Sequence, residues 1–337
     1  MRFANGKRVG AMRLTVSGIA LLALSPTCAQ AYTLTEFDVP GASSTVASGI
    51  NVSGQIVGSY NACCGSHSFI RDLSGTFTTF DPPDALGSVA RAINNRGDVA
   101  GYAYYYGGTA GFLRTADGTA VTFKGPNSEP LVPNAISNTD LVAGLYYGQD
   151  QMYHAFLRQR NGKVISFDPP GSTFTEARGI GPNGEVVGFF NDANDARHGF
   201  LRHSDGSIEV IDVCDSATTV LATNSLGEMT GSCVVGNSQV GFLREPDGSV
   251  STFDAGAGTI SASGDSIQKS GGTVGYAFTN SYPYNSLGFF RTHAGAIETF
   301  QAPDGSNGTE AVSINGWRII GVYYDYNFAA HGFLVKP

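Results

Sequence analysis

The sequence predicts an all-β fold, a seven-bladed β-propeller built from four-stranded repeats of about 44 residues. A Gly-Phe-Leu-Arg-like tetrapeptide recurs along the chain, and its phenylalanines are spaced 43, 44, 44, 42, 47 and 44 residues apart. A fixed period of this length indicates a repeat architecture. Turn residues bound short runs of β-branched and aromatic residues, and no stretch after the leader keeps a helical period. The anchor phenylalanines are Phe69, Phe112, Phe156, Phe200, Phe242, Phe289 and Phe333.

Residues 1–31 are expected to form a secretory signal peptide. Basic residues up to Arg13 precede an apolar run over 14–24, and Ala29-Gln30-Ala31 supplies small residues for cleavage. The remaining residues, 32–337, are then one propeller domain. No later segment reaches the ~20 apolar residues of a membrane span.

Each repeat contains four strand-like runs, here a, b, c and d, at 45–50, 55–60, 67–71 and 76–81 in the first repeat. Small residues dominate run a, which places it nearest a crowded axis. Run b carries a glycine in every repeat. The apolar positions of run d lie three apart, as in Val250 and Phe253, which predicts a bulge on that edge strand.

The two ends of the chain predict how the ring closes. After the leader, a lone run d occupies 33–38, and the chain ends with runs a, b and c over 309–335. These fragments complete one blade if 33–38 pairs beside 333–335. A solenoid would need capping repeats instead, and the sequence contains none.

Run c opens with histidine in four repeats, as His67-Ser68-Phe69, His154-Ala155-Phe156, His198-Gly199-Phe200 and His331-Gly332-Phe333. This motif resembles the His-Ala-Phe repeat of a family of bacterial extracellular proteins, the HAF family. The resemblance covers the chain after the leader and implies export and a repeat fold, without any known reaction. Three repeats depart from the motif, with Ala110, Val240 and Leu287 in place of histidine.

Composition restricts the partners. The formal net charge is −8, and removal of the basic leader makes the chain more acidic, which argues against nucleic acid as a partner.

The histidines of run c belong to different blades and are too far apart to share a metal ion. An imidazole bonded to a neighbouring turn is the favoured interpretation. The recurring aspartate of run d is expected to bond backbone amides of the next loop. We expect no metal and no cofactor.

The repeat register predicts one disulfide. Cys214 lies in a d–a loop, and Cys233 lies at the end of run b in the same blade, on the same face. Cys63 and Cys64 lie three blades away, beyond the Cα separation that a disulfide allows. The sequence therefore favours Cys214–Cys233.

Ligand contacts are expected on the face that carries the b–c loops, because these loops vary in length and are rich in aromatic residues. Tyr104, Tyr147, Tyr284 and Tyr324 represent them. Tyrosine suits recognition of sugars or protein surfaces, but shielding of blade junctions explains the rings equally well. The short a–b and c–d turns of the other face are expected to leave little room for recognition.

Run a adds polar residues at the channel mouth. Arg91, Asn134 and Arg178 belong to consecutive blades and form a positive arc that could hold a carboxylate, although salt bridges between blades are the favoured alternative. Glu176 and Glu310 lie nearer the b–c face and are a candidate carboxylate pair, but their blades are nearly opposite. No nucleophile, metal or phosphate motif accompanies them.

The function expected from these features is that of a secreted, non-catalytic repeat protein. Its partner would be a glycan or a cell-surface or protein surface, bound through the b–c loop face. The alternative is a propeller enzyme, a polysaccharide lyase or glycoside hydrolase with a site in the central channel.

Overall fold

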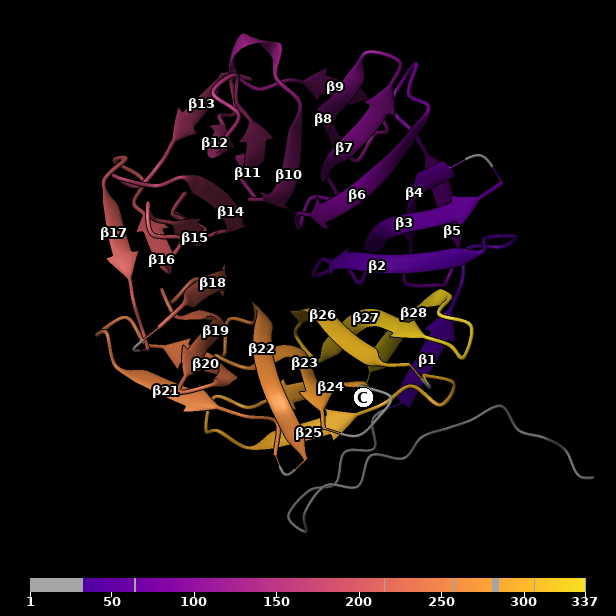
Figure 1. The fold of residues 1–337 in the computed structure, drawn as a ribbon. Coiled ribbons are helices and arrows are strands. Elements are labelled where there is room, and N and C mark those ends of the chain that lie inside the picture. The colour runs from indigo at the N-terminus through magenta and orange to yellow at the C-terminus, as the bar shows by residue number, and fades with distance from the viewer. Residues whose placement is uncertain are drawn as a thin grey trace, which may run out of the picture.

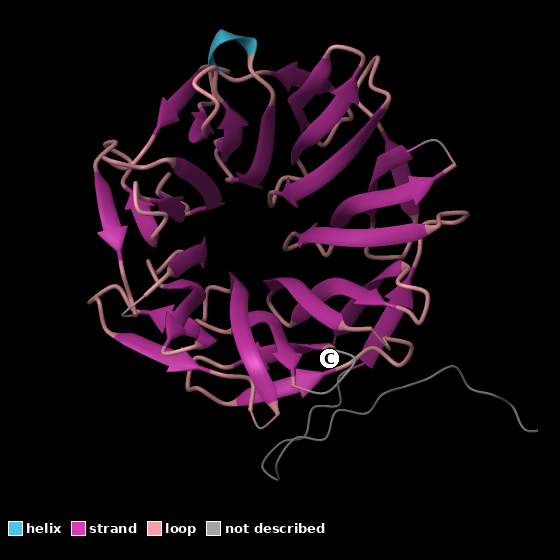
Figure 2. Ribbon diagram, in the orientation of Figure 1, coloured by secondary structure: helices cyan, strands magenta, loops and turns pink. Residues whose placement is uncertain are grey.

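The computed structural model describes residues 33–63, 65–214, 216–256, 258–280, 285–305 and 307–336. The predicted leader, Tyr284 and Cys64 lie outside these residues. The described part contains 28 strands and one short 3₁₀ helix, η1 (Pro126–Ser128). The sheets are arranged radially around a common centre (Figures 1 and 2), so the predicted all-β propeller architecture is confirmed.

Successive groups of four antiparallel strands follow one another around the centre, each with its first strand innermost. The outermost strand of the last group is β1. Single parallel contacts, Tyr153 with Phe174 and Gln239 with Ser261, link two pairs of neighbouring groups. The groups are β2 (Ser44–Ile50), β3 (Ile56–Ala62), β4 (Gly65–Arg71), β5 (Phe77–Phe80); β6 (Gly87–Ile93), β7 (Val99–Tyr105), β8 (Gly108–Arg114), β9 (Ala120–Phe123); β10 (Leu131–Ile136), β11 (Val142–Tyr147), β12 (Tyr153–Arg158), β13 (Val164–Phe167); β14 (Phe174–Ile180), β15 (Val186–Asn191), β16 (Arg197–Arg202), β17 (Ile208–Ile211); β18 (Thr218–Thr223), β19 (Met229–Val235), β20 (Ser238–Arg244), β21 (Val250–Phe253); β22 (Thr259–Ile267), β23 (Thr273–Thr279), β24 (Ser286–Arg291), β25 (Ile297–Phe300); and β26 (Thr309–Asn315), β27 (Arg318–Tyr324), β28 (Ala330–Lys336), β1 (Thr33–Phe37).

Strand β1 pairs antiparallel with β28, in a register that runs from Thr33 opposite Lys336 to Phe37 opposite Gly332. The first and last described strands therefore share one sheet. Leu34 and Phe37 of β1 are buried, and they belong to two different hydrophobic clusters.

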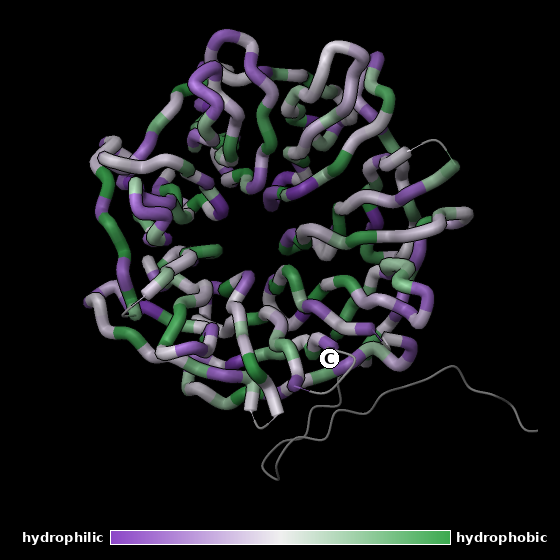
Figure 3. Tube along the Cα trace, viewed as in Figure 1, coloured by the Kyte–Doolittle hydropathy of each residue, from purple (hydrophilic) through white to green (hydrophobic). Residues whose placement is uncertain are grey.

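The hydrophobic core is divided among the sheets. Figure 3 shows hydrophobic positions distributed among all the radial sheets instead of gathered at the common centre. One cluster joins Val57 of β3 to Ala90, Val99 and Phe112 of the next group, so each core fills a junction between neighbouring sheets. All seven anchor phenylalanines have 0% exposure.

The glycine of run b makes room for the anchor ring. A Cβ on Gly188 would overlap the carbonyl oxygen of Glu176 and would lie 2.9 Å from the ring of Phe200. The same two obstacles, a run-a carbonyl and the anchor ring, surround the equivalent glycines of other groups. Glycine is required here for close approach, because any side chain would push run a away from the sheet.

The phenylalanine at the end of run d explains why phenylalanine and arginine recur in the Gly-Phe-Leu-Arg segments. The ring of Phe80 packs edge-on against Phe112 of the following group, with centroids 6.0 Å apart. The guanidinium of Arg114 lies 4.8 Å from the centroid of the same ring. Phenylalanine and arginine of Gly-Phe-Leu-Arg thus both clamp the preceding sheet, through aromatic and cation–π contacts.

The bulge predicted on run d is wrong. Run-d strands pair without a register shift, and the shift occurs in run a, for example between Ala177 and Gly179. The spacing of three in run d has another cause. Phe77 contacts Phe69 of its own sheet whereas Phe80 contacts the next sheet, and an odd spacing places the two rings on opposite faces of the strand.

The predicted disulfide is confirmed. Cys214 and Cys233 are bonded, with their Cα atoms 5.9 Å apart. The bond ties the loop after β17 to strand β19. Among the described residues, no helix has the length and apolar character needed to cross a bilayer.

Candidate functional site

The run-a bulges aim one residue of each sheet toward the axis. At each register shift one residue is left without a partner on run b. Bulges commonly redirect a side chain in this way. The residues at the shift that all seven run-a strands share line an axial cavity of about 250 Å³, whereas Ile260, at a second shift of β22, does not. The lining residues are Ser48, Arg91, Asn134, Arg178, Leu221, Asp265 and Val312.

The structure brings Arg91, Asn134 and Arg178, the predicted positive arc, together at the axis. Hydrogen bonds connect these side chains with Glu176. Arg91 Nη2 donates to Asn134 Oδ1 at 3.2 Å, and Asn134 Nδ2 donates to Glu176 Oε1 at 3.0 Å. Arg178 Nη1 donates to the same Glu176 oxygen at 3.0 Å. Burial lowers the pKa of Arg91, and the nearby positive charge of Arg178 lowers it further. The contacts that join neighbouring blades are therefore hydrogen bonds of Asn134, and the ion pair of this network, Arg178 with Glu176, lies within β14. The salt bridges between blades that the sequence favoured are not among these contacts.

A second charged group shares the channel. Burial raises the pKa of Asp265 to about 7; its hydrogen bond from Ser263 and the charge of Arg178 oppose this shift, and Glu310 adds to it. Burial also raises the pKa of Glu310. Glu176 lies on β14 and Glu310 on β26, and these strands come from nearly opposite sides of the centre (Figure 1). A glycoside hydrolase needs its two carboxyl groups within about 5 to 9.5 Å of each other.

The aromatic residues of the b–c loops separate into two sets. Tyr60, Tyr146 and Tyr323 lie against the histidine of run c, with the Tyr146 ring stacked on His154 at a centroid distance of 5.1 Å. These rings belong to packing. Tyr104 and Tyr147 are 41% and 42% exposed, whereas Tyr324 is half-buried and burial raises its pKa.

Tyr147 begins a line of aromatic contacts that crosses from one sheet to the next. The Tyr147 ring is 5.0 Å from that of Tyr153, and Tyr153 is 5.4 Å from Phe174. Phe174 stacks on Phe189 at 5.7 Å, and the guanidinium of Arg197 lies 4.5 Å from the Phe189 centroid. We call these five residues the aromatic ridge.

The aromatic ridge ends at a cavity that the sequence did not predict. A cavity of about 650 Å³ lies between the β14–β17 and β18–β21 groups on the b–c loop face. Arg197, His198, Asp212 and Gln239 supply polar groups, and the Cys214–Cys233 bond forms part of its wall. The only sequence signal was the disulfide, which fixes the loop that borders the cavity.

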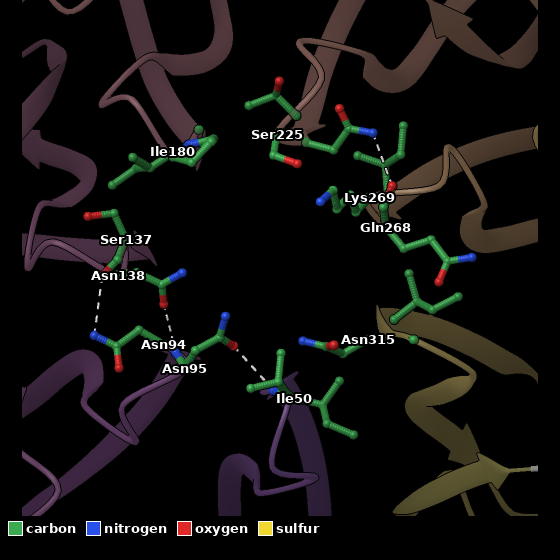
Figure 4. A pocket seen from close by; sticks show the side chains of 18 of the residues that line it. Ile50, Asn94, Asn95, Ser137, Asn138, Ile180, Ser225, Gln268, Lys269 and Asn315 are labelled. Atoms are coloured by element: carbon green, nitrogen blue, oxygen red, sulfur yellow. Dashed lines mark hydrogen bonds between the residues drawn. The ribbon is translucent and has the colours of Figure 1, made fainter.

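The opposite mouth of the channel is more open than the sequence suggested. A cavity of about 840 Å³ is lined by the ends of run a and the a–b turns (Figure 4). Asn95 N–H donates to Asn138 Oδ1 at 2.9 Å, and Asn94 Nδ2 donates to the Ser137 carbonyl at 3.2 Å. The expectation of little room on this face is wrong, because the short turns bond to one another around the rim and leave the axis open.

The four histidines of run c each contact an aspartate at the same repeat position. In each case Nδ1 contacts the aspartate that ends run d, so the expected bonds from that aspartate to loop amides are replaced in these four repeats. Where Ala110 or Leu287 replaces histidine, Lys124 or Gln301 replaces the aspartate. Asp254, which faces Val240, instead accepts from the Gly256 amide at 2.9 Å. The pairs are His67–Asp81 at 2.7 Å, His154–Asp168 at 2.7 Å, His198–Asp212 at 3.0 Å and His331–Asp38 at 2.8 Å.

The contribution of His154 to the stability of the fold should depend on pH. Burial lowers its pKa, but hydrogen bonds with Asp150 and Asp168 raise it more, so the pKa lies above its ordinary value. The stabilisation is then complete below the unfolded pKa of about 6.5 and is lost as pH rises through the folded pKa. His154→Ala should lower the melting temperature by several degrees near pH 6 and by less near pH 8.5. A loss that grows with pH in this range, measured by circular dichroism, would contradict the ion pair.

The radial sheets and the axial cavities define the chain as a β-propeller protein. No protein-family model and no curated protein sequence matches it. Solved structures share its fold. Virginiamycin B lyase from Staphylococcus aureus aligns with a TM-score of 0.58 and 14% identity, over 91% of this chain and 100% of that one.

Two further structures agree with this fold at similarly low identity. A streptogramin B lyase aligns with a TM-score of 0.56 and 12% identity, over 90% of this chain and 97% of that one. A puromycin hydrolase aligns with a TM-score of 0.59 and 10% identity, over 87% of this chain and 55% of that one. At this identity the likeness shows the fold alone.

Proposed function

We propose that the protein is an exported, non-catalytic binding module whose b–c loop face recognises a glycan. The observation that carries the proposal is the aromatic ridge, which lies directly beside the polar 650 Å³ cavity. Pyranose rings stack on aromatic faces, and their hydroxyl groups need nearby donors and acceptors. Arg197, Asp212 and Gln239 supply both kinds of group within one cavity.

The proposal includes a closed ring of seven blades. Pairing of β1 with β28 supports closure, and the His331–Asp38 contact joins the same two ends. A closed ring holds loops from neighbouring sheets in a constant relation, which a binding surface spread over two sheets requires. The HAF resemblance fits this architecture and stays a prediction.

Export is part of the proposal as well. The leader predicted over residues 1–31 would direct the chain out of the cytoplasm. The Cys214–Cys233 disulfide fits an oxidising compartment.

A glycan array with the chain lacking residues 1–31 tests the function, followed by titration of the best ligand. Tyr147→Ala should weaken binding by about 2 kcal/mol, because an exposed aromatic ring is lost from the contact surface. Tyr324→Ala probes the channel mouth. The sequence predicts an equal loss of binding there, and the half-buried position of Tyr324 predicts a loss of stability as well. Melting temperature separates the two effects.

Trp317→Ala is the matched control, since Trp317 is exposed at the opposite mouth. It should leave glycan affinity unchanged. The proposal is wrong if no glycan binds, or if Tyr147→Ala and Trp317→Ala bind alike.

An enzyme is the second candidate, favoured by one observation. Asp265, with its pKa raised to about 7, shares the channel with Arg178, Glu310 and Tyr276. A carboxyl group that is half-protonated near neutral pH is suited to proton transfer. Release of unsaturated product from an acidic polysaccharide, abolished in Asp265→Asn, would favour this candidate over the binding module.

A further inference from the structure

A separate cluster of ligand-type side chains lies between the β18–β21 and β22–β25 groups. Glu228 precedes β19, Glu245 follows β20, and His293 lies in the turn between β24 and β25. Nε2 of His293 is 3.1 Å from Glu228 Oε1 and 3.0 Å from Glu245 Oε1. All three ligand atoms lie within 4.8 Å of one another. Three turns of two neighbouring sheets thus converge on one point.

The arrangement differs from the histidine–aspartate contacts of run c. His154 has Asp168 at Nδ1 and Asp150 at Nε2, so the two carboxylates lie on opposite sides of the ring. At His293 both carboxylates face the same nitrogen. An imidazole nitrogen carries at most one hydrogen, so a single N–H cannot serve two carboxylates well. A cation placed between the three atoms would interact with all of them.

The spacing is close to that of a metal site. Bonds of about 2.1 Å to a tetrahedral ion separate neighbouring ligand atoms by about 3.4 Å. The observed contacts of 3.0 and 3.1 Å require a shift of only a few tenths of an ångström.

Glu228 is held in place for this role. It is only 4% exposed, and Asn224 Nδ2 donates to its second oxygen, Oε2. The same Asn224 nitrogen donates to the Gln268 carbonyl in the next sheet at 3.0 Å, which fixes the amide. Supporting hydrogen bonds of this kind orient metal-binding carboxylates.

Arg291 interacts electrostatically with Glu245, but it does not form a close ion pair with this glutamate. In the described part of the chain, no lysine or arginine lies within salt-bridge distance of Glu228 or Glu245. The equivalent acid before β7, Asp98, has Arg96 Nη2 at 2.7 Å. A buried carboxylate without such a partner is costly unless another cation neutralises it.

We propose that Glu228, Glu245 and His293 bind one divalent transition-metal ion, with Zn²⁺ as the probe. One imidazole nitrogen and two carboxylates suit Zn²⁺, whereas Mg²⁺ prefers an all-oxygen set. His293 is 52% exposed at its side chain, so water can reach the remaining coordination position. The ion joins two neighbouring sheets on the side of the a–b turns, independently of glycan binding.

Isothermal titration of the untagged, chelator-treated chain tests the site. Zn²⁺ should bind with one ion per chain and raise the melting temperature, and Mg²⁺ should not. His293→Ala and Glu245→Gln should each weaken Zn²⁺ binding at least about tenfold. His203→Ala is the matched control, because His203 lies in the corresponding turn of an earlier sheet, 3.6 Å from Glu209 and outside the cluster.

Crystals soaked in Zn²⁺ provide the second readout. An anomalous peak should lie about 2.0–2.2 Å from His293 Nε2 and from an oxygen of each glutamate. Absence of Zn²⁺ binding, or equal affinity in wild type and Glu245→Gln, overturns the proposal. In that case His293 is only a hydrogen-bond partner of the two carboxylates. Glu245 is only half-buried, so its isosteric replacement keeps the test independent of folding.

Discussion

Removal of residues 33–38 should lower the free energy of unfolding by about 5 kcal/mol or more. The deletion takes away the strand that pairs with β28, together with the buried side chains of Leu34 and Phe37. Loss of one buried leucine or phenylalanine alone costs about 2 to 5 kcal/mol. The deletion also leaves the edge of β28 unpaired and removes Asp38, the Nδ1 partner of His331. Urea unfolding followed by circular dichroism measures the change.

A chain that begins at residue 33 is the control for this deletion. This control retains β1, and its midpoint of urea unfolding should equal that of the chain that begins at residue 32. If the chain that begins at residue 39 has the same unfolding midpoint in urea as that control, β1 does not close the ring. The seven-blade proposal is then wrong as well.

Gly188→Ala should destabilise the protein by about 3 kcal/mol, a large effect for one methyl group. The added Cβ overlaps the Glu176 carbonyl oxygen and presses on the ring of Phe200. Neither obstacle can move freely, because the carbonyl belongs to the bulged strand β14 and the ring is fully buried. Thermal unfolding of the purified variant provides the measurement.

Gly107→Ala supplies the comparison. Gly107 lies in the hairpin between β7 and β8, and a Cβ added there would meet no heavy atom within 4 Å. Its substitution should change stability by less than about 0.5 kcal/mol. Equal stability of the two variants would show that the run-b glycines do not define the packing of run a on the anchor ring.

Much of the fold could be predicted because the repeat multiplies a weak local signal. A single Gly-Phe-Leu-Arg segment is an ordinary strand, but its recurrence at Phe69 and six later positions defines a period. The lone run d before Ser44 also indicated its partner, since β28 lacks an outer strand of its own. Register along the repeat then placed Cys214 near Cys233.

Details that depend on neighbouring sheets escaped the sequence. The spacing of Phe77 and Phe80 suggested a bulge, but only the contacts of each ring show that the two serve different junctions. The run-a bulge recurs at the same repeat position, but the sequence of run a does not show which residue lacks a partner on run b. It is this bulge that turns Arg91 and Arg178 toward the axis.

The candidate sites also combine features that the sequence predicted with contacts that only the tertiary structure shows. Sequence alone determined the repeat, the pairing of the cysteines and the face on which the loops vary, because each follows from position within one blade. Tertiary structure decided which side chains meet: Asn134 with Glu176, Tyr147 with Tyr153, and His293 with two glutamates. The first and last of these contacts join different sheets, and their geometry depends on how the sheets are rotated about the axis, which no single repeat encodes.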